Sequence, residues 1–193
     1  SIIGAHMSLS VIPGVDRRSL PPESWADDEK WKIERSREAE DTIRSHITTH
    51  LLDPQTLAFA LADSPIATAA WIWERRKNWS DNTGDVEQSF TREHLCTTAS
   101  LYWCTDSIGS SLRLYHEHFK KPWPLAHNRI PRLEAPTGIA VFPKDVVHLP
   151  HSILNEYTNL KHYTVMPEGG HFAAAEKPEL ATKDIRKFFR ALS

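Results

Sequence analysis

The chain has 193 residues, 40% of them hydrophobic and 25% charged, with a formal net charge of −2. This balance is typical of a globular domain with a sizeable core, and the small net charge argues against nucleic acid or an anionic membrane surface as a partner. The sequence contains no signal peptide, lipidation motif or apolar run long enough to span a bilayer, so we expect a cytoplasmic protein without membrane contact.

The cysteines and tryptophans are concentrated in the first two thirds of the chain. Cys96 and Cys104 lie in an apolar stretch and are predicted to be reduced core residues. Six of the seven tryptophans fall between Trp25 and Trp103. Clustered indoles can line an apolar pocket or fill a core, and the sequence leaves both alternatives open.

The first predicted element is a buried strand, because residues 1–7 are almost continuously apolar. A buried parallel strand needs a neighbour on each edge. We therefore expect one neighbouring strand to lie outside these 193 residues.

A helical region follows an irregular loop over residues 11–22. Its helices are marked by capping side chains, by proline in the first turn, or by turn residues at the end. They are predicted over residues 27–49, 54–61, 65–79, 91–104 and 107–119. In the first helix the expected apolar face consists of Trp31, Ile33, Ile43 and Ile47.

The pattern changes in the last third of the chain. Strands and helices alternate there, over residues 135–143, 152–156, 160–166 and 179–192. The last helix is amphipathic, with Phe188 and Phe189 among its apolar positions.

This order of elements predicts an α/β protein, namely one end of a doubly wound sheet that carries a helical insert. We predict a core strand in residues 1–10, a helical cap or lid in residues 11–133, and the C-terminal part of the α/β core in residues 134–193.

The most informative motif places two glycines before His171, directly after a predicted strand. Glycines permit a tight turn and a close backbone approach, and α/β folds place their sites at the carboxyl ends of parallel strands. Asp145 follows the preceding strand in the same way. A carboxylate can orient a histidine and stabilise its protonated form. In α/β-hydrolases the acid and then the histidine follow the nucleophile along the chain, so we predict that Asp145 and His171 form such a pair.

Further motifs surround these two residues. In the C-terminal region they are Phe-Pro-Lys-Asp at 142–145, Met-Pro-Glu-Gly-Gly-His-Phe-Ala-Ala at 166–174 and Glu-Lys-Pro-Glu-Leu at 176–180. In the helical insert they are residues 63–72, 79–81, 90–93, 101–103 and 108–115. Together they resemble microsomal-type epoxide hydrolases of the α/β-hydrolase fold, over residues 2 to about 192. The resemblance implies the C-terminal half of that fold, a cap with the last strands.

The resemblance also implies a reaction, the hydrolysis of a hydrophobic epoxide to a vicinal diol without a cofactor. An aspartate attacks an epoxide carbon and forms an alkyl-enzyme ester, while cap tyrosines donate hydrogen bonds to the epoxide oxygen. The histidine, oriented by its acid, then activates the water that cleaves the ester. Tyr115 matches a cap tyrosine, His171 the base and Asp145 the acid. Phe172, next to the base, is expected to contact the substrate.

The sequence departs from the family pattern at two points. Trp71 stands where many members have the other cap tyrosine. An indole can donate a hydrogen bond but transfers a proton less readily than a phenol, so we expect Trp71 to bind substrate and Tyr115 to be the main donor. The family's Gly-Gly-Asp-Trp nucleophile motif and His-Gly-x-Pro oxyanion motif do not occur in these 193 residues. We expect the nucleophile in an N-terminal half of the same fold, which would be this chain's partner, and a homodimer is compatible with the sequence.

Two other functions stay open. The same pair can serve haloalkane or ester hydrolysis, although a halide site needs two donors and Trp71 supplies one. Alternatively, the chain is a catalytically incomplete fragment or pseudoenzyme that acts by binding or assembly. For an epoxide hydrolase, detoxification and a biosynthetic step are both compatible with these motifs.

No metal site is predicted. His46 and His50 have the spacing of helical metal ligands but lack the glutamate of a metalloprotease motif, so we expect surface histidines. The remaining candidate histidines have no third ligand at a suitable spacing: His116, His118, His148 and His151. Asp184 is predicted to be a surface or capping charge of the last helix.

Overall fold

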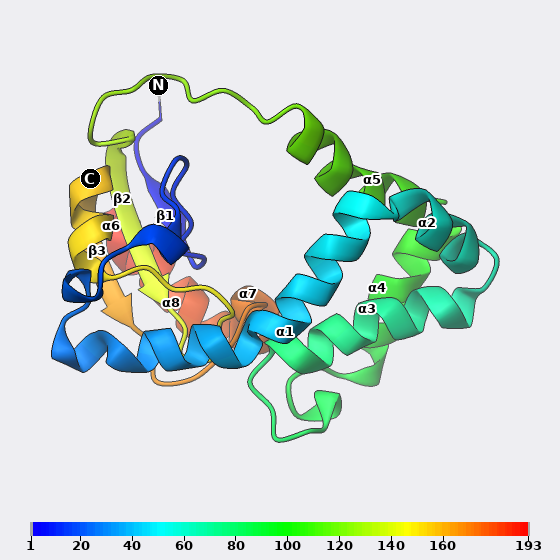
Figure 1. Ribbon diagram of the computed structural model, residues 1–193. Coiled ribbons are helices and arrows are strands. Elements are labelled where there is room, and N and C mark those ends of the chain that lie inside the picture. Colours follow the sequence, from blue (N-terminus) through cyan, green and yellow to red (C-terminus); the bar gives the residue numbers. More distant parts are fainter. Residues whose placement is uncertain (1, 193) are drawn as a thin grey trace. The chain divides into compact units, whose positions relative to one another are not determined.

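The computed structural model describes residues 2–192, and its elements are labelled in Figure 1. The chain forms two compact units. Within the described range, the first unit contains residues 2–39, Trp79–Asp81 and 125–192, and the second contains Glu40–Asn78 and Asn82–Pro124. No helix within residues 2–192 combines the length and the apolar character needed to cross a bilayer.

The long helices of the insert form where capping residues and prolines predict them. They are α1 (Lys30–Leu52), α2 (Pro54–Ala62), α3 (Pro65–Trp79), α4 (Arg92–Cys104) and α5 (Ile108–Lys120). Thr91 caps α4, because its hydroxyl accepts the N–H of His94 at 3.1 Å. Ser64 likewise accepts the N–H of Ala67 at 3.2 Å before α3. In the second unit, α2 packs against α5.

The predicted apolar face of α1 is only partly buried: Trp31 packs against the core of the first unit, whereas Ile47 is 36% exposed. The positions of α1 that are buried form a mostly polar stripe: Lys32, Ser36, Ala39, His46 and His50. The burial of Lys32 is possible because its ammonium contacts the Glu29 carboxylate and donates to the Tyr163 hydroxyl at 2.7 Å. A pattern of apolar residues does not reveal a buried position such as Lys32, whose charge has its partners on other elements.

The first unit is built on a three-stranded parallel sheet in the order β1 (Ala5–Met7), β2 (Leu133–Val141), β3 (Thr158–Val165). Helix α6 (His151–Tyr157) connects β2 to β3, and α7 (Ala173–Glu176) and α8 (Pro178–Arg190) follow (Figure 1). The strand predicted to begin at residue 1 is shorter than expected. Ile2 and Ile3 are 77% and 74% exposed and precede β1, while Ser1 lies outside the described residues.

Both faces of the sheet are covered, as expected for parallel strands. Along β2, Ile139 and Val141 face a core that includes Leu154 of α6. Ala140 faces the opposite core, which includes Ala181 of α8. Successive residues of a strand point to opposite faces, so β2 is buried on both sides.

One row across the sheet is joined to α8 by a buried carboxylate. His6 of β1 pairs with Gly138 of β2, which pairs with His162 of β3. Asp184 of α8 accepts hydrogen bonds from Nε2 of both histidines at 2.8 Å. Between them, a Cβ on Gly138 would lie 2.9 Å from the Phe188 ring, which explains the glycine. The prediction of a surface charge at Asp184 is wrong, because it is 6% exposed.

Two further predictions concern the cysteines and the boundaries of the cap. Cys96 and Cys104 are free and exposed, so their prediction as core residues is wrong. Residues 11–39 group with the strands by contacts. The cap limits at residues 11 and 133 stay a prediction.

Candidate active site

The loop that carries His171 depends on its two glycines. Gly169 has φ +105°, and a Cβ there would lie 2.6 Å from the Phe142 ring. At Gly170 a Cβ would lie 2.7 Å from the Trp79 carbonyl oxygen. The loop is also tied to the end of β2, since the Lys144 N–H donates to the Gly169 carbonyl at 3.0 Å. The backbone therefore brings the carboxyl ends of β2 and β3 together.

Asp145 and His171 meet at this edge of the sheet. Nδ1 of His171 lies 2.9 Å from Oδ1 of Asp145, which also accepts the Val146 N–H at 2.7 Å. Asp145 is 2% exposed, whereas the His171 side chain is 24% exposed. A carboxylate only accepts hydrogen bonds, so Nδ1 carries the proton and Nε2 keeps a lone pair. The arrangement can therefore act as an oriented general base.

Arg35 of α1 binds the backbone at Asp145, a role that no sequence pattern indicated. Its guanidinium donates to the carbonyl oxygens of Lys144 at 2.8 Å and Asp145 at 3.2 Å. His148 lies fully buried in the same region, with its ring edge against Trp31. Burial lowers the pKa of His148 to about 4, so it is neutral at neutral pH.

Two aromatic rings contact His171. The Trp79 ring meets it edge-on with centroids 5.4 Å apart, and Phe172 does so at 5.0 Å. Phe172 is also stacked on Trp79 at 6.4 Å. Phe172, predicted as a substrate contact, thus lies beside the predicted base.

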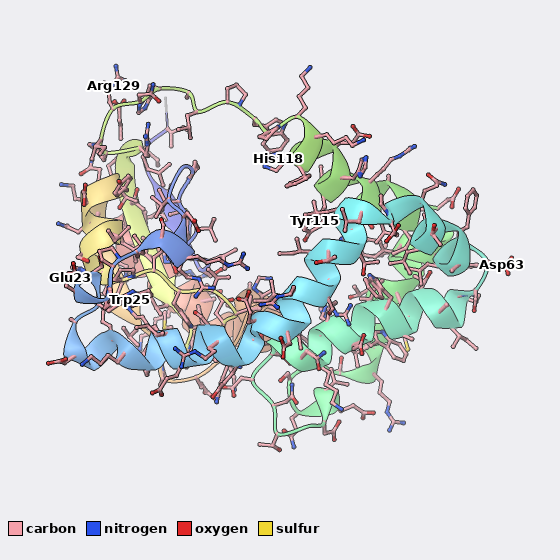
Figure 2. All side chains as sticks on the ribbon, in the orientation of Figure 1. Glu23, Trp25, Asp63, Tyr115, His118 and Arg129 are labelled. Atoms are coloured by element: carbon pink, nitrogen blue, oxygen red, sulfur yellow. The ribbon has the colours of Figure 1, made fainter. Side chains whose placement is uncertain are left out.

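The second unit contains Tyr115 and Trp71, and they enclose two histidines. Tyr115, labelled in Figure 2, belongs to α5. Its Oη lies 3.4 Å from Nε2 of His46, and its ring meets His50 edge-on at 4.7 Å. Trp71 stacks on His46 at 5.9 Å. Arg75 lies 4.4 Å from the centre of the Trp71 ring, over its face.

The prediction of surface histidines at these positions is wrong. His46 and His50 are 8% and 4% exposed because aromatic rings cover them. Burial, with the positive charge of Arg75, lowers the pKa of His50 to about 4. Burial also raises the pKa of Tyr115, so its phenol keeps its proton and can donate. Within residues 2–192, no group of three or more His, Cys, Asp or Glu side chains is arranged to hold a metal ion.

Some of the tryptophans lie in a core, and others line a cavity. Trp25 and Trp79 are buried. In the second unit, Trp73 and Trp103 line an apolar cavity of about 350 Å³ between α3 and α4, which Cys96 also borders. Both alternatives that the sequence left open are therefore realised, each by different tryptophans.

Comparison with known proteins shows what the chain is similar to. No family profile matches the chain. A Stigmatella aurantiaca protein named as an epoxide hydrolase is 31% identical over 192 residues, which is 99% of this chain and 42% of that protein. Epoxide hydrolase 1 of Sus scrofa is 39% identical over 146 residues, covering 72% of this chain and 32% of its own length. This chain is homologous to epoxide hydrolases.

Solved structures show the fold. The Aspergillus niger epoxide hydrolase superimposes with a TM-score of 0.77 and 27% identity, over 99% of this chain and 46% of that one. The silkworm juvenile hormone epoxide hydrolase gives a TM-score of 0.82 at 24% identity, over all of this chain and 49% of that one. The predicted family resemblance and α/β-hydrolase fold, a cap with the final strands, are confirmed. This homologue of the epoxide hydrolases spans less than half the length of the relatives it matches.

Proposed function

We propose that this chain supplies the base, the orienting acid and the epoxide-oxygen donor of an epoxide hydrolase, and that the nucleophilic aspartate lies outside these 193 residues. The observation that carries the proposal is the 2.9 Å contact between His171 and Asp145 at the carboxyl edge of the parallel sheet. Homology to epoxide hydrolases supports the reaction class. We call this chain together with the polypeptide that carries the nucleophile the complete enzyme.

In the proposed mechanism the nucleophilic carboxylate opens the epoxide and becomes an alkyl ester. Nε2 of His171 then takes a proton from water, and the resulting hydroxide attacks the ester carbonyl. Asp145 stabilises the imidazolium that forms, because its buried carboxylate lies on Nδ1. The products are the diol and the regenerated carboxylate.

Tyr115 and Trp71 are proposed to serve the first half of this reaction. Ring opening places negative charge on the epoxide oxygen, and a phenol donor stabilises that charge. Tyr115 is suited to this role because its raised pKa keeps the phenol protonated. Trp71 is proposed to bind the substrate with its ring and its indole N–H, and Phe172 to contact the substrate beside the base. The abundance of aromatic side chains favours a hydrophobic epoxide.

The origin of the diol oxygen tests this mechanism. With excess complete enzyme and an aromatic epoxide in water enriched in oxygen-18, a single turnover should give unlabelled diol, since its new oxygen comes from the enzyme carboxylate. The label should appear in the enzyme. Label in the first-turnover diol would contradict the ester mechanism. Cleavage of an aryl ester or a chloroalkane without diol formation would identify a different hydrolase reaction.

A further inference from the structure

One buried carboxylate beside the predicted base has no role in the mechanism above. Glu176 is the last residue of α7 and is 9% exposed. Its Oε1 accepts the Phe172 N–H at 2.8 Å. Its Oε2 accepts the Gly170 N–H at 3.0 Å and the Asp81 N–H at 2.8 Å. Three backbone amides therefore converge on one side chain.

These bonds belong to a continuous set on the histidine loop. The N–H of His171 itself donates to the Trp79 carbonyl at 2.8 Å. The N–H of Gly169 donates to Oδ2 of Asp81 at 2.8 Å. Together with the two bonds to Glu176, four consecutive amides, 169 to 172, are held by acceptors from outside the loop.

The acceptors come from α7 and from one short piece of chain, Trp79–Asp81, which we call the return segment. It belongs to the first unit but is flanked along the chain on both sides by residues of the second, 40–78 and 82–124. Its fit against the loop is close, because a Cβ on Gly170 would also lie 2.8 Å from Cα of Ser80. Glu176 accepts hydrogen bonds from Asp81 in the return segment and from Gly170 in the histidine loop, and so links the two.

The chemistry of this link requires a carboxylate. Every partner of Glu176 in this set is an N–H donor, so each oxygen must accept. Burial raises the pKa of Glu176, and the three amides oppose that shift by stabilising the charged form. A glutamine there would direct an NH2 group at an N–H, which breaks at least one bond.

We propose that Glu176 and the return segment are positioning elements for His171, which fix the direction of Nε2 during hydrolysis of the alkyl-enzyme ester. The inference rests on the proposed function. The backbone of His171 has little freedom while its own amide and both neighbouring amides are bound.

The first experiment separates the two half-reactions in the complete enzyme. Glu176→Gln should slow ester hydrolysis by about 10- to 100-fold while the rate of alkylation changes little, so the alkyl-enzyme accumulates. Asp184→Asn is the matched control, since it also removes a buried carboxylate of the first unit. Asp184 is not part of the histidine loop; it lies on α8 and binds His6 and His162. It should leave the ratio of the two rate constants unchanged. An unchanged ratio in Glu176→Gln would overturn the inference.

A second readout does not need turnover. The imidazole resonances of His171, assigned by their loss in His171→Gln, should shift or broaden in Glu176→Gln and stay in place in Asp184→Asn. If Glu176→Gln fails to fold, Asp81→Asn weakens the same set at Gly169 and should give a smaller effect of the same kind. Shifted resonances without diol formation by the unaltered enzyme would support the positioning role and contradict the proposed function. Unshifted resonances in both loop variants would overturn the positioning role.

Discussion

The geometry around His171 assigns different tasks to neighbouring titratable groups. Asp145 is buried, and its carboxylate accepts hydrogen bonds from the His171 ring and from the Val146 amide. His148, although buried close by, is neutral at neutral pH because its pKa is about 4. Of these two histidines, His171 is the one with a carboxylate on its ring nitrogen and a partly exposed ring. This contrast favours His171 as the group that exchanges a proton with water.

The first prediction concerns that proton transfer. In the complete enzyme, His171→Gln should still form the alkyl-enzyme ester, because the nucleophile and Tyr115 act in the first step, but the ester should persist. Mass spectrometry after mixing with epoxide should show a stable adduct. Glu168→Gln, an exposed change in the same loop whose partner is Lys177, serves as the control and should turn over normally. Multiple turnover by His171→Gln would rule out its role as the base.

The second prediction compares the two predicted oxygen-binding residues. Tyr115→Phe removes one donor at nearly constant volume and should slow alkylation by roughly a hundredfold, on the order of 3 kcal/mol. Trp71→Phe should cost less if the phenol is the principal donor. Tyr102→Phe, which alters a second tyrosine of the same unit, should have little effect. Single-turnover alkylation rates measure all three, and an unchanged rate in Tyr115→Phe would eliminate its proposed role.

At the level of elements, α8 is attached to the sheet through both packing and charge. Phe188 covers Gly138, and Asp184 reaches β1 through His6 and β3 through His162. The two outer strands are therefore tied to one helix. Burial alone would raise the pKa of Asp184, but its hydrogen bonds with His6, His162 and Thr164 outweigh burial and hold the pKa below the usual 3.8.

This lowered pKa gives the third prediction. A carboxyl group whose pKa is lower in the folded state stabilises the fold above its unfolded pKa, and that contribution is lost as the pH falls through the folded pKa. Asp184→Asn should therefore lower the free energy of unfolding by about 2 kcal/mol at neutral pH. The difference should shrink below about pH 4. Urea denaturation across this range measures it, and a difference that does not vary with pH would contradict the assignment.

For the whole molecule, the most important observation is that the chain is much shorter than its homologues. The chain spans 42% of the Stigmatella protein and 46% of the Aspergillus one. Among the described residues, β1 has one partner strand, β2. A strand edge without a partner favours association with another chain. These features agree with the proposal that a further part of the fold supplies both neighbouring strands and the nucleophile.

The fourth prediction tests this requirement. Residues 1–193 alone should neither form a monodisperse monomer nor produce diol, and adding the polypeptide that carries the nucleophile should restore both together. Size-exclusion chromatography with light scattering, and diol formation from an aromatic epoxide, measure the two effects. A monodisperse 193-residue monomer with turnover would contradict the proposed division of the enzyme.

Local sequence patterns were enough to predict the long helices and the contact between Asp145 and His171. Capping side chains such as Thr91 act over three residues, so their effect is encoded locally. Asp145 and His171 were predictable because each follows a strand, and parallel strands end at the same edge of a sheet. The glycine pair before His171 was also informative, because it indicates a backbone position that tolerates no side chain.

Which polar side chains are buried depends on contacts between residues that lie far apart in the chain. Glu176 and Asp81 are 95 residues apart, and His6 and Asp184 are 178 apart. No local pattern records such partners, although they compensate the hydration that a buried carboxylate loses. His46, His50 and Asp184 were therefore predicted at the surface, and the apolar pattern of α1 did not indicate its fully buried positions. The positioning set around His171 combines both kinds of contact, since Glu176 lies 4 residues from Phe172 but 95 residues from Asp81.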